Sequence, residues 1–143
     1  FAGQLTDDLN LSFGYTQFSL KDLKNGGDAR TFNPTQSLNL LTTYQVPQLP
    51  QLKLGLGVQW QDKTHLDIAE SSANGVVTQK AGTIQQDAYA LVNLMASYEL
   101  NDHITLQANG NNLTNEKYLF NFPDGQGFYG APANYSVAVK LKY

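Results

Sequence analysis

Cysteine is absent from the 143 residues, which excludes a disulfide framework, thiolate metal sites and a cysteine nucleophile. Charged residues are scarce, at 15% against about 25% in a typical soluble protein. The net charge of −3 leaves no basic surface of the kind that binds nucleic acid. No apolar run approaches the roughly 20 residues of a membrane helix. A membrane barrel stays open, because its alternating strands score low in hydropathy.

Apolar and polar residues alternate with a period of two, and this pattern predicts β-strands. In the clearest segment, 52–61, the odd positions are Lys, Gly or Gln, and the even ones are Leu52, Leu54, Leu56, Val58 and Trp60. The same alternation recurs in five more runs, at 9–16, 37–46, 90–99, 104–111 and 134–143. Residues 1–5 resemble the tail of another strand. The sequence therefore predicts six strands and a remnant, with no amphipathic helix.

The connections between these strands alternate between short and long. The short ones are 6–8, 47–51 and 101–103, and the long ones are about 22–35, 63–86 and 115–132. In a soluble sandwich, the short and the long loops need not lie at opposite ends of the strands. An outer-membrane barrel has short periplasmic turns and long outer loops. The loop lengths therefore favour a transmembrane barrel.

Aromatic residues fall near the ends of the predicted strands. One band, at the long-loop end, consists of Tyr15, Trp60, Tyr89 and Tyr135, and a second, at the short-turn end, of Tyr44, Tyr98 and Tyr143. Tyr and Trp favour the membrane interface because the ring is apolar and its tip is polar. The final strand also ends on an aromatic residue. Both features predict strands that cross a membrane.

Six strands and a remnant are too few for a closed barrel, since bacterial single-chain barrels have about eight strands or more. An open sheet would leave unpaired backbone groups in lipid. The chain is therefore expected to be a piece of a longer protein, an oligomer-forming subunit, or an eight-stranded barrel. In the last case the loop 63–86 would hide a strand pair, for example Leu66–Ala69 with Gly75–Gln79.

Two motifs near the C-terminus resemble those of a known family. Residues 111–118 read Asn-Asn-Leu-Thr-Asn-Glu-Lys-Tyr, and residues 129–134 read Tyr-Gly-Ala-Pro-Ala-Asn. With the final strand, they resemble the C-terminus of TonB-dependent siderophore receptors. Thr114 stands where the family usually has Phe, and Ala133 where it usually has Arg. The segments 55–61 and 89–94 also resemble strands of the family.

The resemblance implies an all-β fold, in which this chain is an antiparallel transmembrane β-barrel segment. It would supply about six to seven strands of a plugged barrel of about 22 strands. Residues 1–143 would be the C-terminal part of the barrel domain, with the plug domain not present in this chain. The inward row suits a polar plug or water, and it consists of Lys53, Gln59, Asn93, Glu99, Gln107, Asn109, Asn111 and Lys140.

The same resemblance implies a receptor and transporter in the outer membrane of a Gram-negative bacterium, and not an enzyme. Its transported ligand would be a ferric siderophore, with no covalently bound cofactor. Its other partners would be its own plug domain, the TonB complex through an N-terminal segment absent here, outer-membrane lipid, and the barrel-assembly machinery through the final strand. No nucleic acid is expected. The alternatives are a complete eight-stranded barrel with a structural or adhesive role, and a soluble β-sandwich that buries the 52–60 face.

The candidate ligand-binding residues lie in the aromatic-rich loop after Asn115. They are Tyr118, Phe120, Phe122, Phe128 and Tyr129. Aromatic side chains pack well on the catechol, phenol-ring or hydroxamate groups of siderophores. No catalytic arrangement is expected, because the two histidines, His65 and His103, fall at opposite ends of the strands. Asp62, His65 and Asp67 are close enough in sequence to be considered for a metal, but a solvated loop is the favoured interpretation, and no metal site is predicted.

Overall fold

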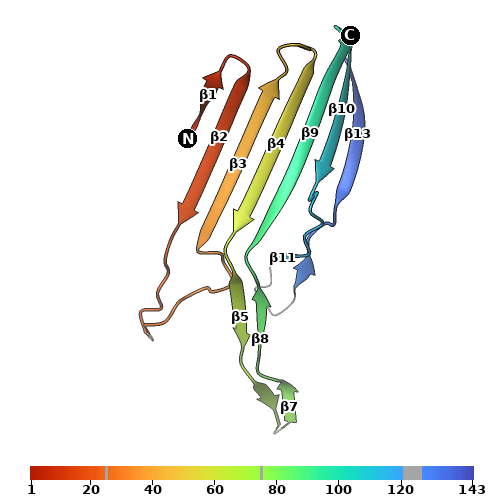
Figure 1. Ribbon diagram of the computed structural model, residues 1–143. Helices are drawn as coiled ribbons and strands as arrows, with labels where there is room; N and C mark the ends of the chain where they lie inside the picture. The colour runs from red at the N-terminus through yellow and green to blue at the C-terminus, as the bar shows by residue number, and fades with distance from the viewer. Residues whose placement is uncertain (25, 75, 121–126) are drawn as a thin grey trace.

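A computed structural model describes residues 1–24, 26–74, 76–120 and 127–143. Seven strands form one antiparallel sheet in the order β1-β2-β3-β4-β9-β10-β13 (Figure 1). They are β1 (Ala2–Thr6), β2 (Leu9–Gln17), β3 (Gln36–Gln45), β4 (Leu52–Gln61), β9 (Tyr89–Asn101), β10 (Ile104–Asn111) and β13 (Asn134–Leu141). The predicted strands and remnant are confirmed. In the described ranges, no helix has the length and apolar character needed to cross a membrane.

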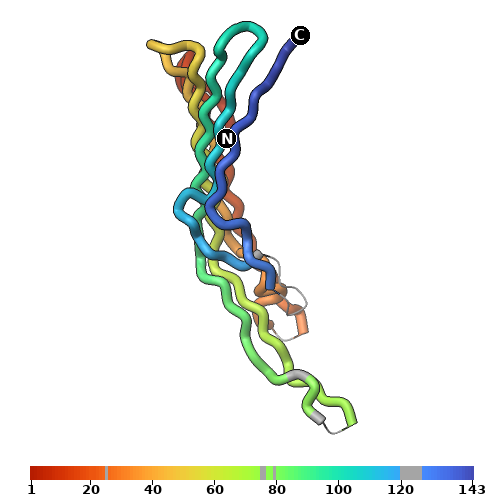
Figure 2. Tube along the Cα trace, turned by 90° about the vertical axis from the view of Figure 1, so that its right-hand side faces the viewer, coloured from red at the N-terminus to blue at the C-terminus, as the bar shows by residue number. Residues whose placement is uncertain are grey.

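The other strands extend the sheet at its long-loop end. A ribbon of β5 (Thr64–Ile68) with β8 (Gly82–Gln86) continues into β6 (Ser71–Ala73) and β7 (Val76–Gln79). β11 (Leu119–Phe120) pairs with β12 (Phe128–Tyr129). Figure 2 shows the β5–β8 ribbon projecting beyond a thin, curved sheet. The predicted pairing of Leu66–Ala69 with Gly75–Gln79 is therefore wrong: Leu66 pairs with Ile84, and none of these strands joins the main sheet.

The register gives the sheet one apolar face and one polar face. Leu40 lies opposite Phe13 and Val58, whereas Asn39 lies opposite Gly14 and Gln59. Successive side chains of a strand point to opposite faces, so each of these rows continues across the sheet. We call the side that carries Asn39 and Gln59 the polar face. The rest of the predicted inward row also lies there: Lys53, Asn93, Glu99, Gln107, Asn109, Asn111 and Lys140.

The sheet is a single layer without a hydrophobic core. No large side chain of the described residues is fully buried, and Val137 on the apolar face is 77% exposed. A soluble sandwich would cover this face, so that interpretation is wrong. β1 and β13 are the two edges and do not pair with each other. The alternative of a complete eight-stranded barrel is therefore also contradicted, because the described strands form an open sheet.

The two aromatic bands need one correction. Tyr15 and Trp60 share a row on the apolar face through Leu38, as predicted. Tyr89, however, pairs with Gln61 and so belongs to the polar face. The physical reason is parity: Tyr89 and Tyr98 are nine residues apart on one strand, and an odd separation puts side chains on opposite faces. Tyr98 keeps its place on the apolar face.

Candidate functional site

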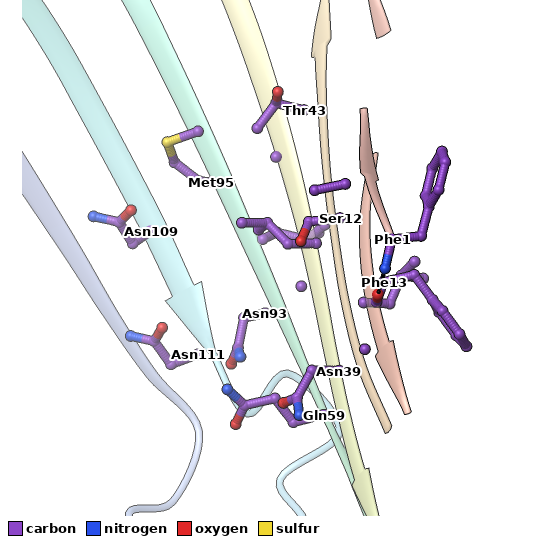
Figure 3. A pocket seen from close by; sticks show the side chains of 17 residues that line it. Phe1, Ser12, Phe13, Asn39, Thr43, Gln59, Asn93, Met95, Asn109 and Asn111 are labelled. Atoms are coloured by element: carbon purple, nitrogen blue, oxygen red, sulfur yellow. Dashed lines mark hydrogen bonds between the residues drawn. The ribbon is translucent and has the colours of Figure 1, made fainter. Parts of the chain in front are cut away.

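The polar face is one candidate binding surface, and the hairpin of β11 and β12 is another. Figure 3 shows the side chains of Asn39, Gln59 and Asn93 on one side of the sheet, and the rings of Phe1 and Phe13 on the other. A shallow hollow lies over this face and crosses strands β1 to β10. A second, smaller hollow continues it toward the long loops, between Ser37, Gln61 and Tyr89. These hollows are open surfaces, suited to contact with a large partner or ligand.

Polar side chains on the β10–β13 part of this face bond to one another. Gln107 Nε2 donates to Asn109 Oδ1 at 3.0 Å, and Asn109 Nδ2 donates to Ser136 Oγ at 3.3 Å. Asn111 Nδ2 donates to Asn134 Oδ1 at 2.9 Å. The last two of these bonds cross from β10 to β13, and cross-strand pairs of this kind hold neighbouring strands in register. This part of the wall is therefore organised mainly for the stability of the sheet.

Asn112 attaches the aromatic-rich loop to the end of β10. It is only 4% exposed, and its backbone has a left-handed φ of 49°, which Asn tolerates better than most residues. Its Nδ2 donates to the carbonyls of Glu116 and Ala131 at 2.9 and 3.0 Å, and its Oδ1 accepts from the Glu116 amide at 2.8 Å. Its own amide donates to Asn93 Oδ1 at 2.9 Å. The resembling motif at 111–118 is thus a structural clamp.

The hairpin of β11 and β12 is held at its base by side chains from other elements. The Tyr118 ring stacks on Tyr89, with ring centroids 4.6 Å apart. The Leu119 amide donates to Oε1 of the buried Gln86 at 2.7 Å, and the Gly130 amide donates to the Tyr118 carbonyl at 2.8 Å. The hairpin is therefore fixed beside the long-loop end of the polar face, which we call its mouth. Gln86 belongs to no short sequence motif, because its partner lies 33 residues away.

Of the five predicted aromatic residues, the three whose side chains the structure describes, Tyr118, Phe128 and Tyr129, do not form one cluster. Tyr118 is half-buried against Tyr89, whereas Phe128 and Tyr129 are 60% and 75% exposed. Phe128 and Tyr129 are successive residues of β12, so their side chains leave the ribbon on opposite faces. Phe120 pairs with Phe128 through the backbone of β11, and Phe122 lies outside the described residues. Phe128 and Tyr129 are thus the exposed rings for which the structure describes a position.

Gly130 leaves room for the Tyr118 ring, and we expect Gly130→Val to remove this contact. A Cβ atom at residue 130 would overlap the ring, so the Tyr118–Tyr89 stack has to open. Overpacking of this kind costs about 1–3 kcal/mol. Hydrogen exchange at the Leu119 amide should become faster. Gly82→Ala is the control, since no atom lies within 4 Å of a Cβ there; equal exchange in both variants would contradict the prediction.

The long loops carry most of the remaining charge but bring no metal ligands together. Among the described residues, no three His, Cys, Asp or Glu side chains come close enough to hold a metal ion. His65 Nε2 lies 4.0 Å from Asp67 Oδ2, while Asp62 accepts from the Thr35 hydroxyl and the Lys63 amide. The Lys21 ammonium donates a hydrogen bond to Asp28 at 2.5 Å and lowers the pKa of that carboxyl. These contacts are those of solvated loops.

Comparison with known proteins identifies the family. Residues 1–113 match the model of the TonB-dependent receptor-like β-barrel. The chain is 27% identical over 143 residues to the ferric-pyoverdine 358 receptor of Pseudomonas putida, covering 99% of this chain and 16% of that receptor. It matches the crystal structure of the outer-membrane ferripyoverdine receptor of Pseudomonas aeruginosa bound to ferripyoverdine, with a TM-score of 0.86 and 27% identity over 98% of this chain and 18% of that one.

A third match shows the fold alone. The ferric-catecholate import receptor Fiu of Escherichia coli has a TM-score of 0.72 at 21% identity, over 98% of this chain and 19% of that one. The chain thus spans less than a fifth of the length of these relatives. They are receptors and transporters rather than enzymes, and their barrels lie in the outer membrane of Gram-negative bacteria. The chain belongs to the family of TonB-dependent receptor β-barrels and represents a segment of such a barrel in the outer membrane.

Proposed function

We propose that residues 1–143 are the C-terminal part of the barrel domain of an outer-membrane receptor that imports a ferric siderophore. The observation that carries this proposal is the match of the whole seven-stranded sheet to the ferripyoverdine receptor, with a TM-score of 0.86 over 98% of this chain. The division of the sheet into two faces supports it as well. The apolar face meets lipid, and the polar face meets the interior of the barrel.

The partners of the complete receptor follow from this placement. A plug domain, supplied by the rest of the receptor, packs against the polar face, and the TonB complex energises transport through an N-terminal segment. The terminal strand, β13, is the part that the barrel-assembly machinery recognises. The ferric siderophore is the transported ligand, and no cofactor is covalently bound. Transport of this kind requires no covalent chemistry from the residues of this chain.

The ligand is expected to meet this chain at the outer mouth. Tyr118, Phe120, Phe122, Phe128 and Tyr129 remain the proposed contacts in the outer loop, with Phe128 and Tyr129 supported by their exposure. The Tyr118–Tyr89 stack and the Gln86 bond hold the hairpin beside the polar face, where an incoming chelate passes. Tyr118 therefore contributes more through the position of the hairpin than through a free ring.

Iron limitation provides the test of this proposal. An antibody against the projecting 64–86 ribbon is used to blot outer-membrane fractions from iron-replete and iron-starved source cells. We expect a band several times heavier than 15.7 kDa that rises on starvation. Deletion of its gene should abolish uptake of radioactive iron from the cognate siderophore, and so should loss of TonB. A band of the chain's own mass that ignores iron, or unchanged uptake after deletion, would overturn the proposal.

A further inference from the structure

The buried polar side chains of this single-layer sheet gather where the long loops leave it. Among the described residues they are Thr64, Gln86 and Asn112, with exposed fractions of 2%, 8% and 4%. Thr64 and Gln86 lie directly opposite each other at the base of the β5–β8 ribbon, so their side chains lie on the same face of it. A two-stranded ribbon cannot bury such a pair by itself. Other parts of the chain therefore cover the ribbon base.

The loop between β2 and β3, described over 18–24 and 26–35, is attached to the β5 side of the ribbon base (Figure 1). The His65 amide donates to the Thr31 carbonyl at 3.0 Å, and the Thr35 hydroxyl donates to Asp62 Oδ2 at 3.4 Å. Successive N–H groups of a strand point to alternate edges. Because the His65 N–H is directed at Thr31, the loop lies along the edge of β5 that faces away from β8.

The β11–β12 hairpin is attached to the β8 side of the same base. Gln86 Oε1 accepts from the Leu119 amide at 2.7 Å, and Gln86 Nε2 donates to the Asp87 carbonyl at 2.9 Å. The Tyr118 ring, next to Leu119, stacks on Tyr89, three residues beyond Gln86. The ribbon base thus bonds to the β2–β3 loop through β5 and to the hairpin through β8.

We propose that the β2–β3 loop, the β5–β8 ribbon and the β11–β12 hairpin form one cooperative body centred on Thr64 and Gln86, so that the three open together rather than one by one. Proteins open locally in contiguous units of this kind. A hydrogen bond is stronger where water is excluded, so the Gln86–Leu119 bond is strongest while the base stays covered. When the loop lifts, water reaches the pair and weakens the attachment of the hairpin.

This coupling goes beyond the import function, because it concerns the loops of the barrel and holds for any ligand. Coupling between two sites is reciprocal. A contact that holds the β2–β3 loop or the ribbon in place therefore also stabilises the position of the hairpin, with its exposed Phe128 and Tyr129.

His65→Pro tests the coupling from the β5 side. It removes the amide that donates to Thr31 and spares the β5–β8 ladder, since this N–H points away from β8. We expect hydrogen exchange at the Leu119 amide, on the other side of the ribbon, to become about 3- to 10-fold faster. His65→Ala is the matched control, because it removes the same side chain and keeps the amide. It should leave the Leu119 amide as protected as in the unmodified receptor.

Gln86→Leu tests the coupling in the reverse direction. It removes the acceptor of the hairpin bond, and it should speed exchange at the His65 amide by a similar factor, although the bond to Thr31 is untouched. Gln85→Leu is the control. Gln85 lies directly opposite His65, but its side chain is exposed and bonds to Asp87. An effect of proximity alone would therefore be larger in the control.

The measurements use the complete receptor in detergent, with the amides of the β4–β9 ladder as the reference for an intact barrel. Faster exchange confined to the β2–β3 loop in His65→Pro, and to the hairpin in Gln86→Leu, would overturn the proposal, because the loops would then open independently. Equal acceleration in either variant and its control would overturn it too. If one variant also releases the reference amides, the other variant decides. The import function is tested separately by iron uptake and stands in each case.

Discussion

Leu40→Arg should destabilise the folded receptor by about 2–4 kcal/mol, whereas Leu41→Arg, one residue further along the same strand, should have little effect. Both leucines lie in the middle of β3. Leu40 is opposite Phe13 and Val58 on the apolar face, while Leu41 is opposite Ser12 and Gly57 on the polar face. An arginine on the first face enters lipid near the bilayer midplane, where its desolvation is not compensated. On the second face it meets water or polar groups.

The measurement is urea unfolding of the complete receptor refolded into lipid vesicles, with each variant compared with the unmodified protein. The pair is well matched, because residue type, strand and depth are shared and only the face differs. Leu41 is 55% exposed within this chain, so the open polar face has space for a longer side chain. Equal destabilisation by the two arginines, or a larger effect at Leu41, would contradict the assignment of the faces.

Asn112→Ala should release the loop between β10 and β13. The substitution removes two donated hydrogen bonds and one accepted hydrogen bond, each worth about 1 kcal/mol. It also leaves alanine in a left-handed conformation, at a further cost of about 1–2 kcal/mol. The sum is roughly 4–5 kcal/mol of local stability. Because the β10–β13 ladder remains, we expect local opening rather than loss of the barrel.

Hydrogen exchange at the Glu116 and Ala133 amides measures this opening. Both are protected by asparagine side chains, Glu116 by Asn112 and Ala133 by Asn115. Exchange should become faster by about three orders of magnitude or more. Asn111→Ala is the control, since this exposed neighbour makes a single side-chain bond, to Asn134. Equal protection in the two variants would show that Asn112 is not the clamp.

The strands themselves were predictable because side-chain direction in a strand is a local property. The alternation of residues 52–61 coincides with β4, and the polar positions at Gln59, Asn93 and Asn109 share one face as expected. Parity alone would also have placed Tyr89 on the polar face, since it is an odd number of residues from Tyr98. The predicted aromatic bands depended only on the distance of each residue from a strand end, and they did not take this rule into account.

The details of the mouth depend on contacts between distant parts of the chain. Asn112 reaches Ala131, 19 residues away, and Gln86 reaches Leu119, 33 residues away. The Tyr118 ring likewise stacks on Tyr89, although the rest of β9 and all of β10 lie between these two residues in the sequence. The period-two pattern of the sequence does not indicate such pairs, because each pair forms only when the fold brings two distant segments of the chain together. For the same reason, the sequence of residues 63–86 indicated a strand pair but did not indicate which strands pair with each other.

The amino-acid sequence alone thus determined the strands, their two faces and the sorting of loops to opposite ends, since lipid and backbone geometry impose these residue by residue. Only the tertiary structure decided that Leu66 pairs with Ile84, that Tyr118 is held by Tyr89, and that Asn112 reaches Ala131. Hydrogen-bond partners and ring contacts are properties of neighbouring atoms in space, and the folded register brings those neighbours together.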